Sequence, residues 1–462
     1  MSESINAIAT GVWTPVLFLL IFGGLFFLIY SRFVHYRYFT HAIAVLRGKY
    51  HDPNDPGQIT PYEALSTALA STVGMGNIAG VAAAISIGGP GALFWMWITA
   101  FVGMSTNFFT STLSVMYRGK DSEGEIQGGP MYVIREALGK SWRPLSVLFC
   151  LCCMIGCLPI FQANQLTQAI VDIGIKSPEA KAWTFSLFGL EINTLKFSIG
   201  IVLTIISGMV ILGGIQRIGR WAGKMVPVMI ILYFLGVATI LLLNASEVPN
   251  CFWLIISDAF AANNYHGEPA LGGIVGGLIV AGVRRASFSN EAGIGTAPMA
   301  LGASQSKEPI REGLVSMMSP AIDTLLVCTL TALAILITGA WKSSENGVTM
   351  TALAFETSLG EPGRYLLLVC TFFFAITSLF SYSYYGSKSL SFLIGVPASK
   401  YYNYFYLSTI VVGAVASMTD IINVIDIAYA LMAVPTTLSG LVLAPKVMAA
   451  ATSYFQRLKA EN

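Results

Sequence analysis

Three glycines and an asparagine interrupt an otherwise apolar stretch, Thr72 to Gly80, and the backbone there could bind charged groups. A glycine inside a helix costs about 1 kcal/mol relative to alanine. Lipid offers no water to the N–H and C=O groups that a break sets free, so a break at membrane depth must be covered by protein or bind something. Many secondary transporters hold substrates and ions on such groups.

The N–H groups after the break could hold a carboxylate. Those of Met75, Gly76 and Asn77 have no acceptor within the helix, and the start of a half-helix adds the positive end of a dipole. A ligand that also carries a cationic group would need carbonyl oxygens as partners for it. We expect these in a second glycine-rich stretch, Gly272 to Gly277. Its candidate substrate-binding residues are Gly273, Gly276 and Gly277.

Two adjacent hydroxyl residues, Thr377 and Ser378, could bind sodium. Sodium is a hard cation that takes five or six oxygens, and hydroxyl and carbonyl groups suit it. The alternative is that both hydroxyls bond back to the carbonyl one turn earlier. We favour sodium because the pair is expected opposite the broken helix. Thr72 and Asn77 are candidates for a further sodium site beside the carboxylate.

The composition is that of a membrane protein. Of 462 residues, 55% are hydrophobic and only 11% are charged, with a mean hydropathy of +0.69. Soluble proteins carry about 25% charged residues. The formal net charge of +2 comes with no basic run, which argues against nucleic-acid binding.

Apolar runs of about 20 residues predict eleven membrane-spanning helices. They lie at 13–32, 60–87, 91–117, 144–171, 195–214, 222–244, 269–286, 311–338, 363–391, 402–418 and 424–451. All but five of the 26 lysines and arginines fall in loops on one side of this arrangement. The positive-inside rule makes that side the cytoplasm, so the N-terminus is expected outside and the C-terminus inside.

The last ten predicted spans divide into two halves of five with opposite orientation. Each half begins with one glycine-rich stretch. Either stretch alone more often indicates close helix packing, but their matching positions point to a transporter's central site. The predicted division is a peripheral span with a cytoplasmic surface segment (1–59), two repeats (60–244 and 269–451), an extracellular connection (245–268) and a cytoplasmic tail (452–462).

The segment Gly88 to Gly103 closely resembles the signature of the alanine/glycine:cation symporter family, the sodium:alanine symporters. Its Trp-Met-Trp element is highly specific, and the resemblance runs through nearly the whole chain. Further matching segments are Gly76–Val81, Gly128–Tyr132, Phe288–Gly293, Asp323–Thr324, Val327–Thr329 and Tyr384–Gly386.

The resemblance implies sodium-coupled uptake of alanine and glycine. It also implies a fold similar to the LeuT-type transporters, with ten core helices in a five-plus-five inverted repeat and one extra N-terminal span. By the same resemblance, the carboxylate meets main-chain groups at Met75 and Gly76. The carbonyls of Ala70 and Val73 would complete the sodium site of the hydroxyl pair.

Four further side chains are expected at the substrate. Gln162 resembles a position that reaches the substrate in this family, although membrane glutamines also form hydrogen bonds between helices. Met75 stands where the family usually has a small hydroxyl residue, and Tyr382 where it commonly has tryptophan. Both are expected near the pocket, where they would influence the substrate range. Thr377 is a further candidate for substrate contact.

Ionisable groups within spans are functional candidates by default. Asp323 is expected to be either a cation or proton site, or a buried partner for a loop arginine. Glu291 follows Arg284 and Arg285 closely and is expected in a cytoplasmic ion-pair network or gate.

The sequence therefore predicts an all-α polytopic protein of the cell membrane that imports a small neutral amino acid with sodium by alternating access. No cofactor is expected besides sodium as coupling ion, and the oligomeric state is open. The alternatives are proton coupling, or a larger substrate such as serine, threonine or glutamine. An ion channel would show a repeated filter or charged rings, and a membrane enzyme would need a catalytic cluster. Neither pattern is found in the sequence.

Overall fold

Helices make up almost all of the described chain because, in lipid, a helix satisfies the backbone within its own segment. The computed structural model describes residues 2–175, 183–187, 190–260, 274–416 and 419–461.

The first part of the chain contains the Thr72–Gly80 interruption and the helices around it. In chain order its elements are α1 (Ser2–Tyr30), α2 (Val34–Arg37), α3 (Phe39–Leu46), α4 (Pro61–Thr72), η1 (Gly76–Gly80), α5 (Val81–Gly88), α6 (Ala92–Met116), β1 (Gly119–Lys120), β2 (Ile126–Gln127), α7 (Pro130–Val133), η2 (Ile134–Leu138), η3 (Lys140–Trp142), α8 (Arg143–Gly156), α9 (Ile160–Ala169), η4 (Ile170–Gly174), β3 (Thr184–Leu187), β4 (Leu190–Asn193), α11 (Thr194–Ile211) and α12 (Gly214–Leu243). The η segments are short π- or 3-10-helical pieces.

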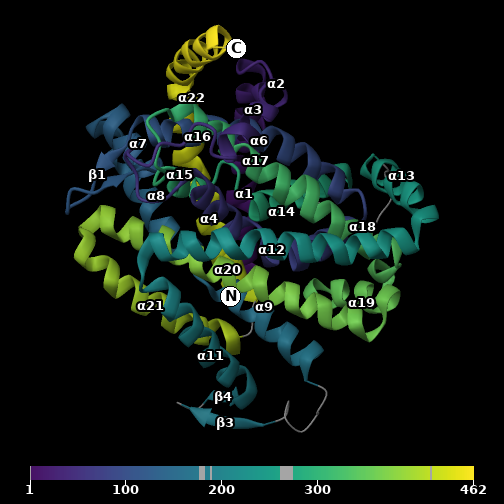
Figure 1. Ribbon diagram of the computed structural model, residues 1–462. Helices are drawn as coiled ribbons and strands as arrows, with labels where there is room; N and C mark the ends of the chain where they lie inside the picture. Colours follow the sequence, from purple (N-terminus) through teal and green to yellow (C-terminus); the bar gives the residue numbers. More distant parts are fainter. Residues whose placement is uncertain (1, 176–182, 188–189, 261–273, 417–418, 462) are drawn as a thin grey trace.

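The second part contains another interrupted helix. Its elements are η5 (Ala245–Glu247), α13 (Val248–Ala259), α14 (Ile274–Asn290), α15 (Thr296–Leu301), α16 (Pro309–Ser316), α17 (Met318–Pro320), η6 (Ala321–Cys328), α18 (Thr329–Ile337), η7 (Ala340–Lys342), α19 (Gly347–Leu359), α20 (Glu361–Ile394), α21 (Val396–Val415) and α22 (Thr419–Glu461). Figure 1 shows α12 and α20 crossing the middle of the helical body, and α4 packs against both.

The described residues contain eight helices that are long and apolar enough to cross a membrane, or up to nine if the bent pair of α4 with η1 and α5 is one span. Helices α14 and α21 coincide with predicted spans but fall outside that set. The all-helical membrane architecture is confirmed, whereas the count of eleven spans stays a prediction.

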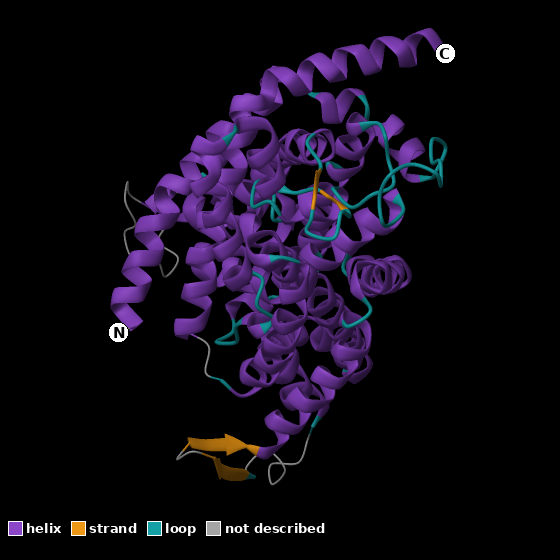
Figure 2. Ribbon diagram, turned by 90° about the vertical axis from the view of Figure 1, so that its left-hand side faces the viewer, coloured by secondary structure: helices purple, strands orange, loops and turns teal. Residues whose placement is uncertain are grey.

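Two small antiparallel hairpins are the strands of the described chain. In one, Gly119 pairs with Gln127; in the other, Thr184 pairs with Asn193. Figure 2 shows the β3–β4 hairpin at one end of the molecule, and the C-terminal end of α22 projecting at the other.

The first interruption lies where the sequence predicts it. Helix α4 starts with a capping box, in which Thr60 and Glu63 each accept from the other's backbone N–H, and it ends at Thr72. The chain then bends by 47° before it continues through η1 into α5.

The second interruption lies elsewhere than predicted. Helix α14 runs without a break through Gly276 and Gly277, while Gly273 lies outside the described residues. The chain leaves the helix at Glu291 instead and resumes at α15. Gly293 (φ 82°) and Gly295 (φ 115°) adopt backbone angles there that favour glycine. Placing the break at Gly272–Gly277 is therefore wrong for the described part, because paired glycines in a membrane helix also serve close packing.

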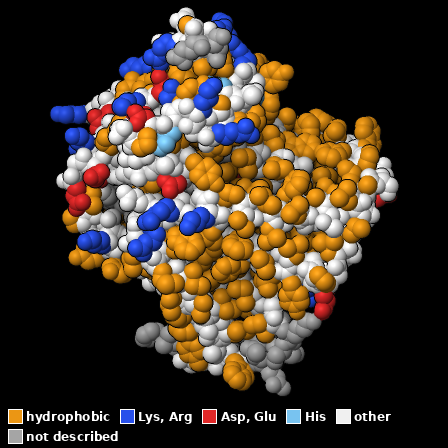
Figure 3. All heavy atoms as spheres, viewed as in Figure 1, with side chains coloured by type: hydrophobic (Ala, Val, Ile, Leu, Met, Phe, Trp, Pro, Cys, Tyr) orange, Lys and Arg blue, Asp and Glu red, His pale blue; other side chains and the backbone are white. Residues whose placement is uncertain are grey.

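The surface agrees with a lipid-embedded protein. Large apolar side chains are exposed on several helices, such as Phe22 on α1 (63%), Ile205 on α11 (59%) and Leu242 on α12 (77%). Figure 3 shows apolar side chains covering the right and lower parts of one face, while lysines and arginines gather at its upper left. Exposed apolar areas of this size mark surfaces made for an apolar environment.

Glycine sets the distance between α14 and α6. A Cβ added at Gly282 would lie 2.6 Å from the Ala92 carbonyl oxygen and 2.7 Å from Trp95 Cβ. We predict that Gly282→Ala lowers the apparent melting temperature in detergent by about 5 °C, since overpacking costs about 1–3 kcal/mol. Gly11→Ala, with nothing within 4 Å of the new Cβ, is the control. If both variants have the apparent melting temperature of the wild type, the close contact of α14 and α6 at Gly282 is contradicted.

Candidate substrate and ion site at the two helix breaks

At the first break, the Asn77 side chain takes the place of a backbone carbonyl as hydrogen-bond acceptor. Helix α4 makes its last regular bond from Val73 N–H to the Leu69 carbonyl (2.7 Å). The next N–H, that of Gly74, donates to Asn77 Oδ1 (2.8 Å) instead of continuing the helix to Ala70. An asparagine amide competes with the backbone in this way at helix ends. The Ala70 carbonyl oxygen thereby becomes available to other groups.

Several oxygens meet at this free carbonyl. Ser378 Oγ on α20 lies 2.9 Å from the Ala70 oxygen and 3.0 Å from the Phe374 oxygen. Thr377 Oγ1 lies 3.2 Å from the same Phe374 oxygen. Gly74 permits this approach, because an added Cβ would collide with Ser378 Oγ. Three of the predicted sodium ligands are thus brought together.

Two details differ from the simple expectation for this cluster. Phe374 contributes a carbonyl that the sequence reasoning missed, because only its side chain appears in a sequence. Thr377 Oγ1 also lies 2.9 Å from the Phe373 carbonyl oxygen and 3.6 Å from Met229 Sδ, so its hydroxyl faces α12 in part. Val73 lies where α4 ends, with a backbone conformation (ψ 85°) outside the helical region.

Two predicted substrate residues contact each other directly. Met75 N–H donates to Gln162 Oε1 on α9 at 3.3 Å. An amide oxygen therefore occupies the N–H on which the substrate carboxylate is predicted. Both side chains are buried, as are Gly76 and Asn77.

Asp323 joins the two breaks. Its Oδ1 accepts from Asn77 Nδ2 (2.6 Å), next to the first break. Its Oδ2 accepts from Ser289 Oγ (2.9 Å), just before the second break, and from Thr324 Oγ1 (2.7 Å). The carboxylate is fully buried in the π-helical segment η6, a kind of segment that is frequent at functional sites. Within the described chain, no arginine or lysine pairs with it.

Aromatic rings border the two breaks. A Cβ at Gly76 would lie 3.4 Å from Ser289 Cα and 3.8 Å from Phe288 Cδ1, so the two broken helices touch there. The Phe288 ring packs edge-on against Phe161 (5.4 Å between centroids) and lies 5.5 Å from Tyr429. Rings this close to Gly76 limit the space for a ligand side chain.

The remaining candidates have other partners. Thr72 Oγ1 bonds back to the Ala68 and Leu69 carbonyl oxygens (3.2 and 3.4 Å). Tyr382 OH donates to Glu291 Oε1 (2.6 Å). Tyr382 is therefore attached to the second break.

The expected cytoplasmic ion-pair network of Glu291 is wrong. Arg284 pairs with Asp426 of α22, far away in sequence, whereas the Glu291 carboxylate is bonded by hydroxyl groups. Asp323 likewise bonds amide and hydroxyl groups rather than a loop arginine.

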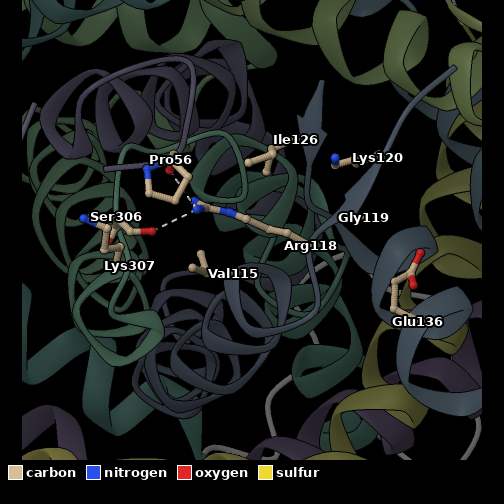
Figure 4. Close-up of a pocket in the computed structure, with 9 residues that line it drawn as sticks. All are labelled: Pro56, Val115, Arg118, Gly119, Lys120, Ile126, Glu136, Ser306 and Lys307. Carbon is tan, nitrogen blue, oxygen red and sulfur yellow. Dashed lines mark hydrogen bonds between the residues drawn. The ribbon is translucent and has the colours of Figure 1, made fainter. Parts of the chain in front are cut away.

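Arg118, just after α6, joins the segment before α4 to the segment after α15, away from the two breaks. Its guanidinium donates to the Pro56 oxygen (3.0 Å) before α4, and to the oxygens of Gly302 (2.9 Å), Ser304 and Ser306 (2.9 Å) after α15. Figure 4 shows Arg118 reaching between Pro56 and Ser306 at the edge of a cavity of about 540 Å³. Backbone bonds between these segments, such as Gln305 N–H to the Ile59 oxygen (2.7 Å), reinforce the junction.

Two interrupted membrane helices that meet at a shared polar cluster are an arrangement typical of secondary transporters. The fold is that of the LeuT-type transporters: the crystal structure of MhsT in complex with L-phenylalanine matches with a TM-score of 0.57. That match covers 86% of this chain and 99% of MhsT, at 13% identity.

The chain belongs to the sodium:alanine symporter family, whose model matches residues 1–462. It is 34% identical to the sodium/alanine symporter AgcS of Methanococcus maripaludis over 465 residues, which cover 98% of this chain and 97% of AgcS. An uncharacterized transporter of Haemophilus influenzae is 38% identical, with 99% and 97% covered. The Bacillus subtilis protein named "Probable sodium/glutamine symporter GlnT" is 32% identical, with 99% and 92% covered. The family and these relatives are transporters, not enzymes.

The Arg118 junction generates a prediction. We expect Arg118→Lys to increase amide hydrogen exchange in segments 52–60 and 302–308, because an ammonium group cannot span four carbonyls as the planar guanidinium does. Hydrogen exchange with mass spectrometry measures this. Arg135→Lys, a half-exposed arginine paired with Glu136, is the control. Unchanged hydrogen exchange in both segments would contradict the conclusion that Arg118 holds them together.

Proposed function

We propose that this protein is a sodium-coupled symporter that imports a small neutral amino acid, alanine or glycine, across the cell membrane by alternating access. The observation that carries the proposal is the meeting of two interrupted helices at Asp323, beside a cluster of neutral oxygens at Ser378. Such a pair supplies groups for both ends of a zwitterion and for a cation at membrane depth.

The substrate carboxylate binds the N–H groups of Met75 and Gly76 in this proposal. Gln162 Oε1 occupies the first of them at 3.3 Å and would be displaced, after which its amide N–H group is free to donate to the carboxylate. Asn77 holds the turn in place through Gly74.

The ammonium group of the substrate faces the second break. We assign it to the Asp323 carboxylate and the Ser289 hydroxyl, which are hydrogen-bonded to each other; Ser289 is the residue that packs against Gly76. This assignment replaces the prediction from the sequence that carbonyls of Gly273, Gly276 and Gly277 bind the ammonium group. A buried carboxylate is a stronger partner for an ammonium group than neutral carbonyls are.

Sodium binds the oxygens of Ala70, Phe374, Thr377 and Ser378, with Val73 at the end of α4 as the fifth ligand. All are neutral, which suits a monovalent hard cation that must be released in every cycle. A second sodium between Thr72 and Asn77 has less support, because both side chains already hold hydrogen bonds to their own helix region.

The small substrate follows from the walls of the site. Met75, Phe288 and Phe161 are buried around the break, and Gly76 packs against Ser289. The competing proposal is a larger substrate or proton coupling. Because one relative is named as a probable sodium/glutamine symporter, glutamine is among the substrates to be tested.

The topology that we propose has eleven spans, with a five-plus-five inverted repeat over 60–244 and 269–451. The N-terminus is outside and the C-terminus in the cytoplasm. The bias of lysine and arginine among the loops supports this orientation.

The proposal is tested by uptake into proteoliposomes. Labelled alanine and glycine are offered under an inward sodium gradient, an equal potassium gradient or a proton gradient. Unlabelled alanine, glycine, serine, threonine and glutamine are the competitors. We expect sodium-driven accumulation that alanine and glycine inhibit most. Failure to transport any of these amino acids under every gradient would refute the function.

The sodium site gives a more specific prediction. Ser378→Ala removes an oxygen that contacts both α4 and α20, and we expect the sodium concentration for half-maximal uptake to rise about tenfold, since losing one ligand costs about 1–2 kcal/mol. Ser383→Ala, where Oγ bonds only the Phe380 carbonyl (2.6 Å), is the matched control on the same helix. If both variants keep the wild-type sodium dependence, sodium does not bind here.

A further inference from the structure

A carboxylate at the second break is surrounded by hydroxyl groups. Glu291 Oε1 accepts from Tyr382 OH (2.6 Å) and Tyr429 OH (3.0 Å), and Oε2 accepts from the Thr296 hydroxyl and from Ser71 Oγ (3.4 Å). Glu291 is fully buried. An ionised carboxylate can accept about four hydrogen bonds, so these four hydroxyls fill its acceptor positions.

Within the described residues, no cation lies beside this carboxylate. No lysine, arginine or histidine there contacts Glu291, and Arg284, which precedes it on α14, pairs with Asp426 instead. The titratable groups that face Glu291 from the helices packed around it are Tyr382 and Tyr385 of α20, Tyr429 of α22, Cys157 after α8 and Asp323 of η6. None of them is basic. Ionisable residues inside membrane proteins typically mark ion pathways or proton relays.

The backbone at this position favours a residue without a side chain. Glu291 has φ 54°, the left-handed region that glycine adopts without strain. A non-glycine residue persists there only where the surrounding structure holds it, and such positions cluster at functional sites. The four hydroxyl contacts are what holds this side chain.

The surrounding network accommodates a proton as well as a negative charge. Ser71 Oγ lies 2.8 Å from the Ala68 carbonyl oxygen and 3.2 Å from Tyr385 OH, besides its contact with Glu291. When Glu291 is ionised, Ser71 donates to Oε2. When Oε2 holds a proton, the carboxyl donates to Ser71 Oγ, and Ser71 donates to the Ala68 oxygen instead. One hydroxyl rotation thus satisfies both states.

We propose that Glu291 is the binding site of a coupling proton, separate from the sodium and substrate sites. The proton comes from one aqueous side, binds Oε2 and leaves to the other side in the same cycle. This proposal rests on the amino-acid transport proposed above and adds a second coupling ion to it.

The contacts of Glu291 show how a proton would affect the transport cycle. The four hydroxyl donors lie on four different elements, α4, α15, α20 and α22. Hydrogen bonds to an ionised carboxylate are about twice as strong as those to a neutral one. Protonation therefore loosens the second break from α20 and α22 together, which permits the broken helices to move against them.

The experiment uses the full chain in proteoliposomes that contain a pH-sensitive dye. Alanine is added with equal sodium on both sides, and the lumenal pH is followed in vesicles that hold no alanine. Counterflow is measured separately in vesicles preloaded with alanine. We expect alanine entry into wild-type vesicles to acidify the lumen. Glu291→Gln should retain counterflow and lose the alanine-dependent acidification. Glu123→Gln, the same change at an exposed residue, should behave as the wild type.

The outcomes separate this proposal from the transport function. Sodium-driven alanine accumulation without proton movement in the wild type would overturn the proton site alone, as would unchanged acidification in Glu291→Gln. Absence of any amino-acid uptake by the wild type would overturn the transport function and the proton site with it.

If Glu291→Gln does not fold, a second variant tests the proton site. Tyr382→Phe removes one donor that stabilises the ionised carboxylate. We expect the midpoint of the pH profile of counterflow to move about one pH unit higher, since a hydrogen bond to a charged group has about that effect. An unchanged profile in Tyr382→Phe would overturn the proposal.

Discussion

The candidate site depends on one hydrogen bond, from Gly74 N–H to Asn77 Oδ1. A membrane helix cannot stop without giving its free backbone groups new partners, because lipid supplies none. Asn77 gives the N–H a partner within the turn, so the helix ends and the Ala70 carbonyl turns to Ser378. The 47° bend, the oxygen cluster and the Met75 N–H that bonds Gln162 instead of a helix carbonyl all follow from this exchange.

The Nδ2 atom of the same Asn77 amide links this turn to the second break. Through Asp323 it is linked to Ser289, and two residues further on Glu291 is held by hydroxyls of four elements. Away from the breaks, Arg118 binds both the segment before α4 and the segment after α15. The two interrupted helices are therefore connected at the centre and at one end. A ligand that changes one break must act on the other.

The sequence was sufficient to place the first break, because three glycines and an asparagine together disfavour an uninterrupted helix in an apolar span. It misled at the second, where glycine pairs at 272–277 concealed the polar signal of Asn290 and Glu291 followed by two glycines. The pairing of Asp323 with Asn77, and of Arg284 with Asp426, joins residues more than 140 positions apart. No local pattern encodes such contacts. Carbonyl ligands such as Phe374 leave no mark in a sequence at all.

The most direct test of this account is sodium binding to the purified protein, measured by isothermal titration for the wild type and Asn77→Ala. Without the asparagine, the Gly74 N–H is free to bond the Ala70 carbonyl, which withdraws that oxygen from the site. The account predicts that the sodium affinity falls at least about tenfold, with Asn250→Ala, on a surface helix, as the control. Equal sodium affinity in the wild type and Asn77→Ala would contradict it.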